Sequence, residues 1–338
     1  MPDPFLRLPQ EQRSEALAVA ADVSGRPDNI LEKDIWVVWT LKALFDSHFG
    51  EHLCFKGGTS LSKAYGVINR FSEDVDVTYD IRKILDDQLG DSGPDPVPDT
   101  RSQADRWTKA VRERLPEWVE SVALAEIRTR IDAEQAPADV TADNCNLILS
   151  YEQAAATMTD YVTAQILVEF GARATGEPLQ VRSVVCDAAE YLPALAFPTA
   201  SARAMAPERT FWEKATAAHA FCLEGRLRGE RYARHWYDLV RLDDAGVAAA
   251  ALGDRDLGRK VARHKSRFFI VKSANGEIVD YEVAIDGGLQ LVPVEDGRRA
   301  LEDDYQRMVE AGLLEEDAPS FAEIMEGCAA VEARANSE

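Results

Sequence analysis

The sequence predicts an α+β protein, in which a small mixed sheet flanked by helices is followed by a mostly helical C-terminal half. Short apolar or alternating runs, typical of strands, lie mostly before residue 200, whereas runs with apolar residues at helical spacing occur along the whole chain. The first elements also follow the order helix, strand, glycine turn, helix, strand. We therefore expect two domains, residues 1–200 and residues 201–338.

The spacing of apolar residues predicts the N-terminal elements. We expect a helix over residues 10–24 and a second one from Asn29, with apolar residues at 31, 35, 38 and 41. HLCF is a short apolar run typical of a buried strand, and the two glycines that follow interrupt it. A helix is then expected from Thr59, and RFSEDVDVTYD alternates as a strand does.

The remaining segments add two strands and several helices. The proline-rich stretch 90–100 predicts a loop, and residues 101–135 predict charged helices. QILVEFGAR and QVRSVVCD predict two strands joined by a turn at TGEP. PERTFWEKATAAHAFCLEG and RYARHWYDLVRL predict two helices, Asn275–Gly276 predicts a hairpin, and the acidic tail from Arg298 predicts further helices.

Composition limits the classes of function. The 338 residues carry a net charge of −21, which argues against a protein that coats nucleic acid but allows one local basic patch. The five cysteines are scattered, with no CxxC spacing, so we expect reduced thiols and no zinc site. The N-terminus lacks the apolar region of a signal peptide, and no apolar run approaches the ~20 residues that span a bilayer. We expect a soluble, cytoplasmic protein that does not bind membranes.

Two carboxylates in the strand at residues 70–80 indicate a metal site. Because strand side chains alternate between faces, Ser72, Asp74 and Asp76 share one face, while Val75 and Val77 point to the core. Carboxylates this close repel each other and need a positive charge between them. Mg²⁺, or Mn²⁺, fits, because such ions are held by one or two carboxylates together with substrate phosphates.

The preceding glycine turn indicates a phosphate site. Gly57 and Gly58 allow positive φ and close approach of a ligand to the backbone, and Thr59 and Ser60 fall in the first helical turn, where N–H groups are free. Beside a pair of metal-binding carboxylates, this arrangement suits a metal-bound nucleoside triphosphate (NTP) undergoing in-line displacement at phosphorus.

GGTSLSKAY followed by RFSEDVDV resembles the nucleotidyltransferase signature of the DNA polymerase β superfamily. More narrowly, it resembles the AbiEii/AbiGii nucleotidyltransferase toxins of type IV toxin–antitoxin systems, the group that includes the MenT toxins. Four further stretches resemble motifs of that family: EKD at 32–34, EKATAAHAF at 213–221, ARHWYDLVRL at 233–242, and the C-terminal DDYQRMV with SFAEIME.

The resemblance implies roles for individual residues. Asp74 and Asp76 match the metal-binding, catalytic pair, and Ser72 matches the hydroxyl two residues before it. Lys214 matches a lysine that contacts the nucleotide phosphates, and Asp238 matches a late acidic residue required for activity, which could act as a base or anchor an Arg or Lys. The phosphate loop comprises Gly57, Gly58, Thr59 and Ser60, a third metal carboxylate is expected from Glu169, and Lys63 and Arg70 are either phosphate contacts or surface charges.

The resemblance implies transfer of a nucleoside monophosphate from an NTP to RNA, most plausibly the 3′ end of tRNA, by a growth-arresting toxin of a toxin–antitoxin or phage-defence system. It also implies an antitoxin encoded nearby, without requiring a direct complex. Two alternatives stay open. The acceptor could be a small molecule or a protein hydroxyl, or the chain could be a non-catalytic nucleotide-binding module.

Two groups of basic residues bear on the acceptor. They fit either a polynucleotide backbone or helix faces paired with nearby aspartates such as Asp243, Asp244, Asp254 and Asp256. We expect His219 and His235 to be structural. The first group is Arg226, Arg228, Arg231 and Arg234, and the second is Arg255, Arg259, Lys260, Arg263, Lys265, Arg267 and Lys272.

Overall fold

The computed structural model describes residues 3–70, 72–89, 93, 95–157, 163–224, 231–310, 312–314 and 318–337. The chain divides into two compact units that interleave along the sequence. The sheet unit comprises Met1–Ala64, Glu73–Pro96 and Lys109–Ala204. The helical unit comprises Tyr65–Ser72, Val97–Thr108 and Met205–Glu338.

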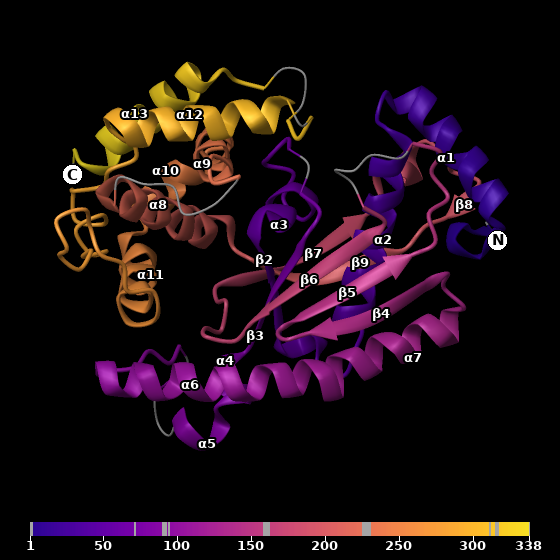
Figure 1. Cartoon of the computed structure of the whole chain (residues 1–338), viewed down its shortest axis with the longest axis horizontal. Helices are drawn as coiled ribbons and strands as arrows, with labels where there is room; N and C mark the ends of the chain where they lie inside the picture. Colours follow the sequence, from indigo (N-terminus) through magenta and orange to yellow (C-terminus); the bar gives the residue numbers. More distant parts are fainter. Residues whose placement is uncertain are drawn as a thin grey trace. The chain divides into compact units, whose positions relative to one another are not determined.

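A seven-stranded mixed sheet organises the sheet unit, with strand order β4-β5-β6-β3-β2-β9-β7 (Figure 1). The central strand β3 pairs antiparallel with β2 and parallel with β6. A separate parallel pair joins β1 and β8. The strands are β1 (Asp3–Pro4), β2 (Leu53–Lys56), β3 (Val75–Tyr79), β4 (Ala138–Asp143), β5 (Asn146–Tyr151), β6 (Gln165–Gly171), β7 (Leu179–Val185), β8 (Leu195–Ala196) and β9 (Thr199–Met205).

Strand register gives the sheet one apolar and one polar face at its centre. Val75 lies opposite Val168, and Val77 lies opposite Phe170, so these side chains share a face and are buried. Asp76 and Glu169, one residue along, lie opposite each other on the other face. The predicted alternation therefore holds for Val75, Asp76 and Val77, whereas Ser72 and Asp74 precede β3, which is shorter than the predicted strand.

Helices cover the apolar face. Trp36, from α2 (Asp28–Phe45), stacks on Tyr151 of β5, and Trp118, at the end of α6 (Arg101–Trp118), stacks on Tyr79. The π-helical segment η3 (Val119–Ala123) and α7 (Leu124–Glu134) continue α6, and α7 runs alongside β4 (Figure 1). The other helical elements of the sheet unit are η1 (Phe5–Arg7), α1 (Gln10–Ser24), η2 (Gly50–His52), α3 (Gly57–Lys63), α4 (Ile81–Ile84), α5 (Asp86–Leu89) and η4 (Asp187–Glu190).

The helical unit packs around α8 (Pro207–Glu224), which contacts α9 (Arg234–Asp244), α10 (Val247–Gly253) and α11 (Arg255–Phe268). Trp212 and Trp236 are fully buried there, and their indole N–H groups donate to backbone carbonyls, as buried tryptophans require. Two C-terminal helices, α12 (Glu295–Glu310) and α13 (Phe321–Ala335), complete the unit, and α13 packs on α9.

The predicted fold class is confirmed, with corrections to individual elements. Strands β6 and β7 exist as predicted but do not pair, because β3, β2 and β9 lie between them. The hairpin around Asn275–Gly276 is reduced to one bridge between Lys272 and Ile278. Strands β4, β5 and β9 were not predicted. None of the described helices combines the length and apolarity needed to cross a bilayer.

Candidate functional site

The turn between β2 and α3 brings backbone against the carboxylate of Asp76. Gly57 has φ of +78°, a left-handed conformation that glycine adopts without strain. A Cβ at this position would lie 2.1 Å from Asp76 Oδ2, so only glycine leaves room for the carboxylate. Gly58 is buried in the first turn of α3. The glycine pair therefore lets the helix start directly beside the aspartate.

The two hydroxyls after the glycines are fully buried and shape the turn. Thr59 Oγ1 donates to the backbone carbonyl of Asp74 at 2.5 Å, which ties α3 to the residue just before β3. Ser60 Oγ donates to the carbonyl of Gly57 at 3.1 Å. Both side chains therefore fix backbone geometry, and the donors that α3 offers to a ligand would be its first-turn N–H groups.

Asp76 shares the polar face of the sheet with two other charged side chains. Lys56 on β2 and Glu169 on β6 are its register partners on either side. Lys56 Nζ lies 3.8 Å from Asp76 Oδ1, and both side chains are part-exposed. Lys56 was not predicted as a site residue, since only the strand register shows that it is the neighbour of Asp76.

The donor set is compatible with a divalent cation. Asp74 and Asp76 are half-buried, Glu169 is exposed, and carboxylate oxygens are the ligands that Mg²⁺ and Mn²⁺ take. Within the described residues, however, no three metal-binding side chains converge, so Glu169 does not join the aspartates in a preformed cluster. The absence of a side chain on Gly57 lets this carboxylate lie directly beside the start of α3.

A buried ion pair holds the residue before Asp74. Lys33 of α2 is 3% exposed, lies 2.5 Å from Glu73 Oε2 and also donates to the carbonyl of Thr163 at 3.0 Å. Removing one partner of such a pair strands a buried charge, which is strongly destabilising. The approach to β3 is thus fixed from two sides, by Lys33 at Glu73 and by Thr59 at Asp74.

Other polar residues on α2 bind backbone N–H groups of distant segments. Glu32 accepts from the N–H groups of Ala154 and Ala155 at 2.8 and 2.9 Å, and Asp28 accepts from that of Ala156 at 2.8 Å. Burial raises the pKa of Glu32 despite these donors. The EKD motif is therefore a buried set of anchors.

Lys63 is engaged in two ion pairs within the sheet unit. Its Nζ lies 2.6 Å from Asp34 Oδ1 and 2.6 Å from Asp187 Oδ1, and the side chain is 12% exposed. Burial alone would lower the pKa of Lys63, but the two carboxylates outweigh it and raise the pKa. These contacts favour a structural role for Lys63, joining α2, α3 and η4, over contact with a phosphate.

Asp238 in the helical unit anchors two cations. Its carboxylate is fully buried and accepts from Arg70 Nε at 2.7 Å, from a second Arg70 nitrogen at 2.9 Å, and from Lys214 Nζ at 2.8 Å. Burial opposes ionisation, but the charges of Arg70 and Lys214 hold the pKa of Asp238 well below its usual range. A carboxylate so tightly paired is an anchor rather than a base.

The same network keeps Lys214 nearly buried. Burial lowers the pKa of Lys214, Asp238 opposes this shift, and the neighbouring Arg70 charge adds to it. Arg70 lies four residues before Asp74 in the sequence and belongs to the helical unit. Ser72, between them, is half-buried and belongs to the helical unit.

In the two groups of basic residues singled out from the sequence, some side chains make structural contacts and others are exposed to solvent. Arg259 pairs with Asp256 and Asp286, and Arg255 donates to backbone carbonyls. Lys265 donates to the carbonyl of Glu213 at 2.6 Å, and burial lowers its pKa to about 8. Part of the second basic group therefore stabilises the helical unit. Arg226 and Arg228, from the first group, lie outside the described residues.

The two histidines lie in polar or cationic surroundings within the helical unit. His219 accepts from the backbone N–H of Gln290 at 3.1 Å, and burial lowers its pKa to about 4. Burial, followed by the charges of Lys214 and Arg234, lowers the pKa of His235 as well. Both rings are therefore neutral at pH 7, which agrees with the expected structural role.

Comparison with known proteins gives a family match and two similar structures. Residues 39–327 match the family described as nucleotidyl transferase AbiEii toxin, type IV toxin–antitoxin system. MenT4, a nucleotidyltransferase toxin from Mycobacterium tuberculosis, is 16% identical, with a TM-score of 0.46 over 95% of this chain and 90% of that one. JHP933 from Helicobacter pylori is 14% identical, with a TM-score of 0.37 over 97% and 93% of the two chains. No curated protein sequence is similar enough to this chain to count as a relative.

Proposed function

Because the chain belongs to the AbiEii family of nucleotidyl transferase toxins of type IV toxin–antitoxin systems, we propose that it transfers a nucleoside monophosphate from an NTP to an acceptor hydroxyl, most plausibly the 3′ end of tRNA. The observation that supports this proposal is the position of the Asp76 carboxylate. Its carboxylate lies against Gly57, between register partners Lys56 and Glu169, and two residues beyond the tethered Asp74.

The reaction balances as a displacement at the α-phosphorus. The acceptor hydroxyl gives up its proton to water, its oxygen forms the new P–O bond, the bond from the α-phosphorus to the bridging oxygen breaks, and pyrophosphate leaves with the electron pair of that bond. Asp74 and Asp76, with Glu169 as a possible addition, would hold a divalent cation, and a bound cation would neutralise phosphate oxygens. Lys56 would balance the negative charge beside Asp76, and the first-turn N–H groups of α3 would hold phosphate oxygens.

The helical unit would contribute a cationic side chain whose position is fixed by an ion pair. We propose that Lys214 contacts the nucleotide phosphates, as the family resemblance suggests, and that Asp238 fixes its position together with Arg70. For the domain organisation, we propose residues 1–200 as the nucleotidyltransferase domain and residues 201–338 as a mostly helical domain. Lys63 would support α3 from behind through Asp34 and Asp187.

The acceptor is the finer part of the proposal. RNA is favoured by the family resemblance and by basic side chains of α11 such as Lys260 and Arg267, for which the described residues show no ion pair. The net charge of −21 favours instead a small molecule or a protein hydroxyl. The protein would act in the cytoplasm, where NTPs and tRNA are present, beside an antitoxin encoded nearby that need not bind it.

A transfer assay tests the proposal. Purified protein is incubated with Mg²⁺ or Mn²⁺, total tRNA and each α-labelled NTP in turn, beside an Asp76→Asn variant and the control Asp143→Asn, which alters an exposed aspartate on β4. We expect label in tRNA from one nucleotide, retained in the control and reduced ~10²-fold or more in Asp76→Asn. EDTA should abolish it.

Each other result moves the proposal in a defined direction. Pyrophosphate released only when cell extract replaces tRNA would assign a small molecule or protein as the acceptor. Nucleotide binding without pyrophosphate release under either condition would support the alternative that the chain is a non-catalytic nucleotide-binding module. Full activity in Asp76→Asn would refute the assignment of the carboxylate pair.

A further inference from the structure

A pocket lies at the opposite end of the central strands from Asp76. Its volume is about 350 Å³, and it is formed where β2 begins and β3 ends, with one wall from the segment after β6. Tyr79, the last residue of β3, lies opposite Leu53, three residues beyond Asp76. At a rise of about 3.3 Å per residue, the pocket lies about 10 Å or more along the strands from Asp76.

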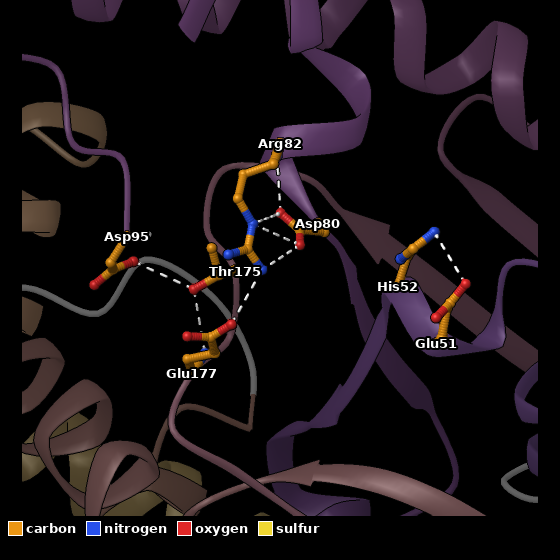
Figure 2. A network of polar contacts seen from close by, with 7 residues as sticks. All are labelled: Glu51, His52, Asp80, Arg82, Asp95, Thr175 and Glu177. Atoms are coloured by element: carbon orange, nitrogen blue, oxygen red, sulfur yellow. Dashed lines mark hydrogen bonds and ion pairs between the residues drawn. The ribbon is translucent and has the colours of Figure 1, made fainter. Parts of the chain in front are cut away.

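Two of the three acidic residues of this pocket are paired with one arginine. Figure 2 shows Arg82 between Asp80 and Glu177, and its guanidinium donates to both carboxylates at 2.6 to 3.0 Å. The backbone supports the same geometry, because the N–H of Asp80 donates to the carbonyl of His52 at 2.9 Å. A third carboxylate, Glu51, has 76% of its side chain exposed. Arg82 therefore offsets one of the two charges of Asp80 and Glu177, while Glu51 lies 3.7 Å from His52 Nε2 and is largely exposed to solvent.

The wall behind Glu177 is fixed in the same way. Thr175 Oγ1 donates to Asp95 at 3.2 Å and accepts from the backbone N–H of Glu177 at 3.3 Å (Figure 2). Gly176, between them, has φ of +82°, and a Cβ there would lie 2.5 Å from the sulfur of Cys54. The pocket is thus a built feature with walls tied to β2 and β3.

Two cationic residues of the pocket, Arg203 and Lys83, differ from Arg82 in having no ion pair among the described residues. Arg203 is half-buried, and its Nε is buried with no hydrogen-bond partner among the described residues. Lys83 is exposed and forms no ion pair in the part of the chain that the structure describes. Both line the pocket together with His52, whose pKa is lowered by burial and by the charges of Lys83 and Arg203, against the opposing charges of Glu51 and Asp80. Buried nitrogen without a partner costs free energy unless a ligand supplies an acceptor.

We propose that this pocket binds the phosphate group of a small phosphate monoester, held by Arg203, Lys83 and His52. A doubly charged oxyanion offers several acceptors, and Arg and Lys are the side chains that most often bind phosphate. The volume lies at the lower end of small-molecule sites, about 300–1,000 Å³, which suits a phosphate with a group of sugar size. This proposal does not rest on the transfer reaction, because none of its residues belongs to the Asp76 site.

Binding measured without catalysis tests the proposal. Inorganic phosphate, ribose 5-phosphate and adenosine monophosphate are titrated in EDTA, without NTP, against the wild-type chain. Lys83→Glu and Arg203→Met should weaken binding at least about tenfold, because each removes a charge-assisted contact. Lys109→Glu, which alters an exposed lysine of the same unit, and Asp76→Asn should bind as the wild type does. Lys83 is exposed, so its variant should fold, and thermal melting checks Arg203→Met.

The probes distinguish the sources of the phosphate. Binding of all three, with the monoesters tighter, supports the proposal, and a preference for adenosine monophosphate identifies a nucleotide ligand. Unchanged binding in Lys83→Glu, or loss of binding in Asp76→Asn, would assign the phosphate to the other end of the strands and overturn the proposal. Absence of binding by any of the three would overturn it as well. As a further readout, the NMR-measured pKa of His52 should rise on binding, since a bound anion favours the imidazolium.

Discussion

Replacing Gly57 by alanine separates backbone strain from damage to the site. The new Cβ would lie 2.1 Å from Asp76 Oδ2 and 2.9 Å from its Cγ, whereas such contacts essentially never fall below 3.0 Å. The carboxylate must therefore retreat by about 1 Å, and a displacement of that size at a reacting centre can cost ~10²-fold in rate. The φ of +78° adds a cost of about 1–2 kcal/mol in stability, because alanine is strained there.

Gly25 supplies the matched control. It ends α1 with φ of +72°, and no atom lies within 4 Å of a Cβ built there. Gly25→Ala should therefore lose about 1–2 kcal/mol of unfolding free energy in urea, as Gly57→Ala does, and keep its transfer activity. Affinity for Mn²⁺, measured by electron paramagnetic resonance, should fall only in Gly57→Ala.

The comparison between the two variants decides the outcome. If Gly57→Ala keeps the activity and Mn²⁺ affinity of Gly25→Ala, Asp76 can move without consequence, and the geometry of this turn is not what the site requires. If both variants lose activity equally, the loss follows from stability, and the contact between Gly57 and Asp76 has no separate effect.

Three further predictions concern the buried charges. Asp238→Asn should lose about 3–5 kcal/mol in urea unfolding, because Arg70 and Lys214 remain buried without a counter-charge, and a loss below 1 kcal/mol would contradict the pairing. Since the folded pKa of Asp238 is depressed, its stabilisation is present above the unfolded value of 3.8 and lost as pH falls below it, so the variant should show a flatter acid limb. Lys33→Met should lower kcat more than it raises KM, because Lys33 holds Glu73 next to Asp74, and Lys33→Arg should restore part of kcat. If Lys33→Met changes only the melting temperature, the role of Lys33 is purely structural.

Local pattern predicted the elements whose partners lie close in sequence. α1 spans the predicted residues 10–24, and α2 begins within one residue of the predicted start, because a helix buries one stripe of its own sequence. β2 and β3 were likewise evident from a short apolar run and from alternation. Strand order was not predictable. The segments of β6 and β7 look like the two strands of a hairpin, and only the strands from other parts of the chain that lie between them show that they do not pair.

The same limit applies to the candidate site. The glycines and Asp74 and Asp76 are recognisable because their spacing is local, whereas Lys56 enters only through strand register. The ion pair of Arg70 with Asp238 joins residues 168 positions apart, and that of Lys63 with Asp187 joins residues 124 apart. For such residues the sequence shows a charge but not its partner, and the partner decides between ligand contact and anchor.

The buried polar residues of α2 explain how a helix can fix a distant site. Asp28, Glu32, Lys33 and Asp34 are all buried, at a cost in desolvation that apolar side chains would avoid. Apolar packing alone is non-directional and would let the contacted segments slide, whereas each of these groups binds a defined atom on another segment. Their partners include the residue before Asp74 and, through Lys63, the end of α3. Changes on α2 should therefore act on the carboxylate pair through geometry, and lower kcat as well as the free energy of unfolding.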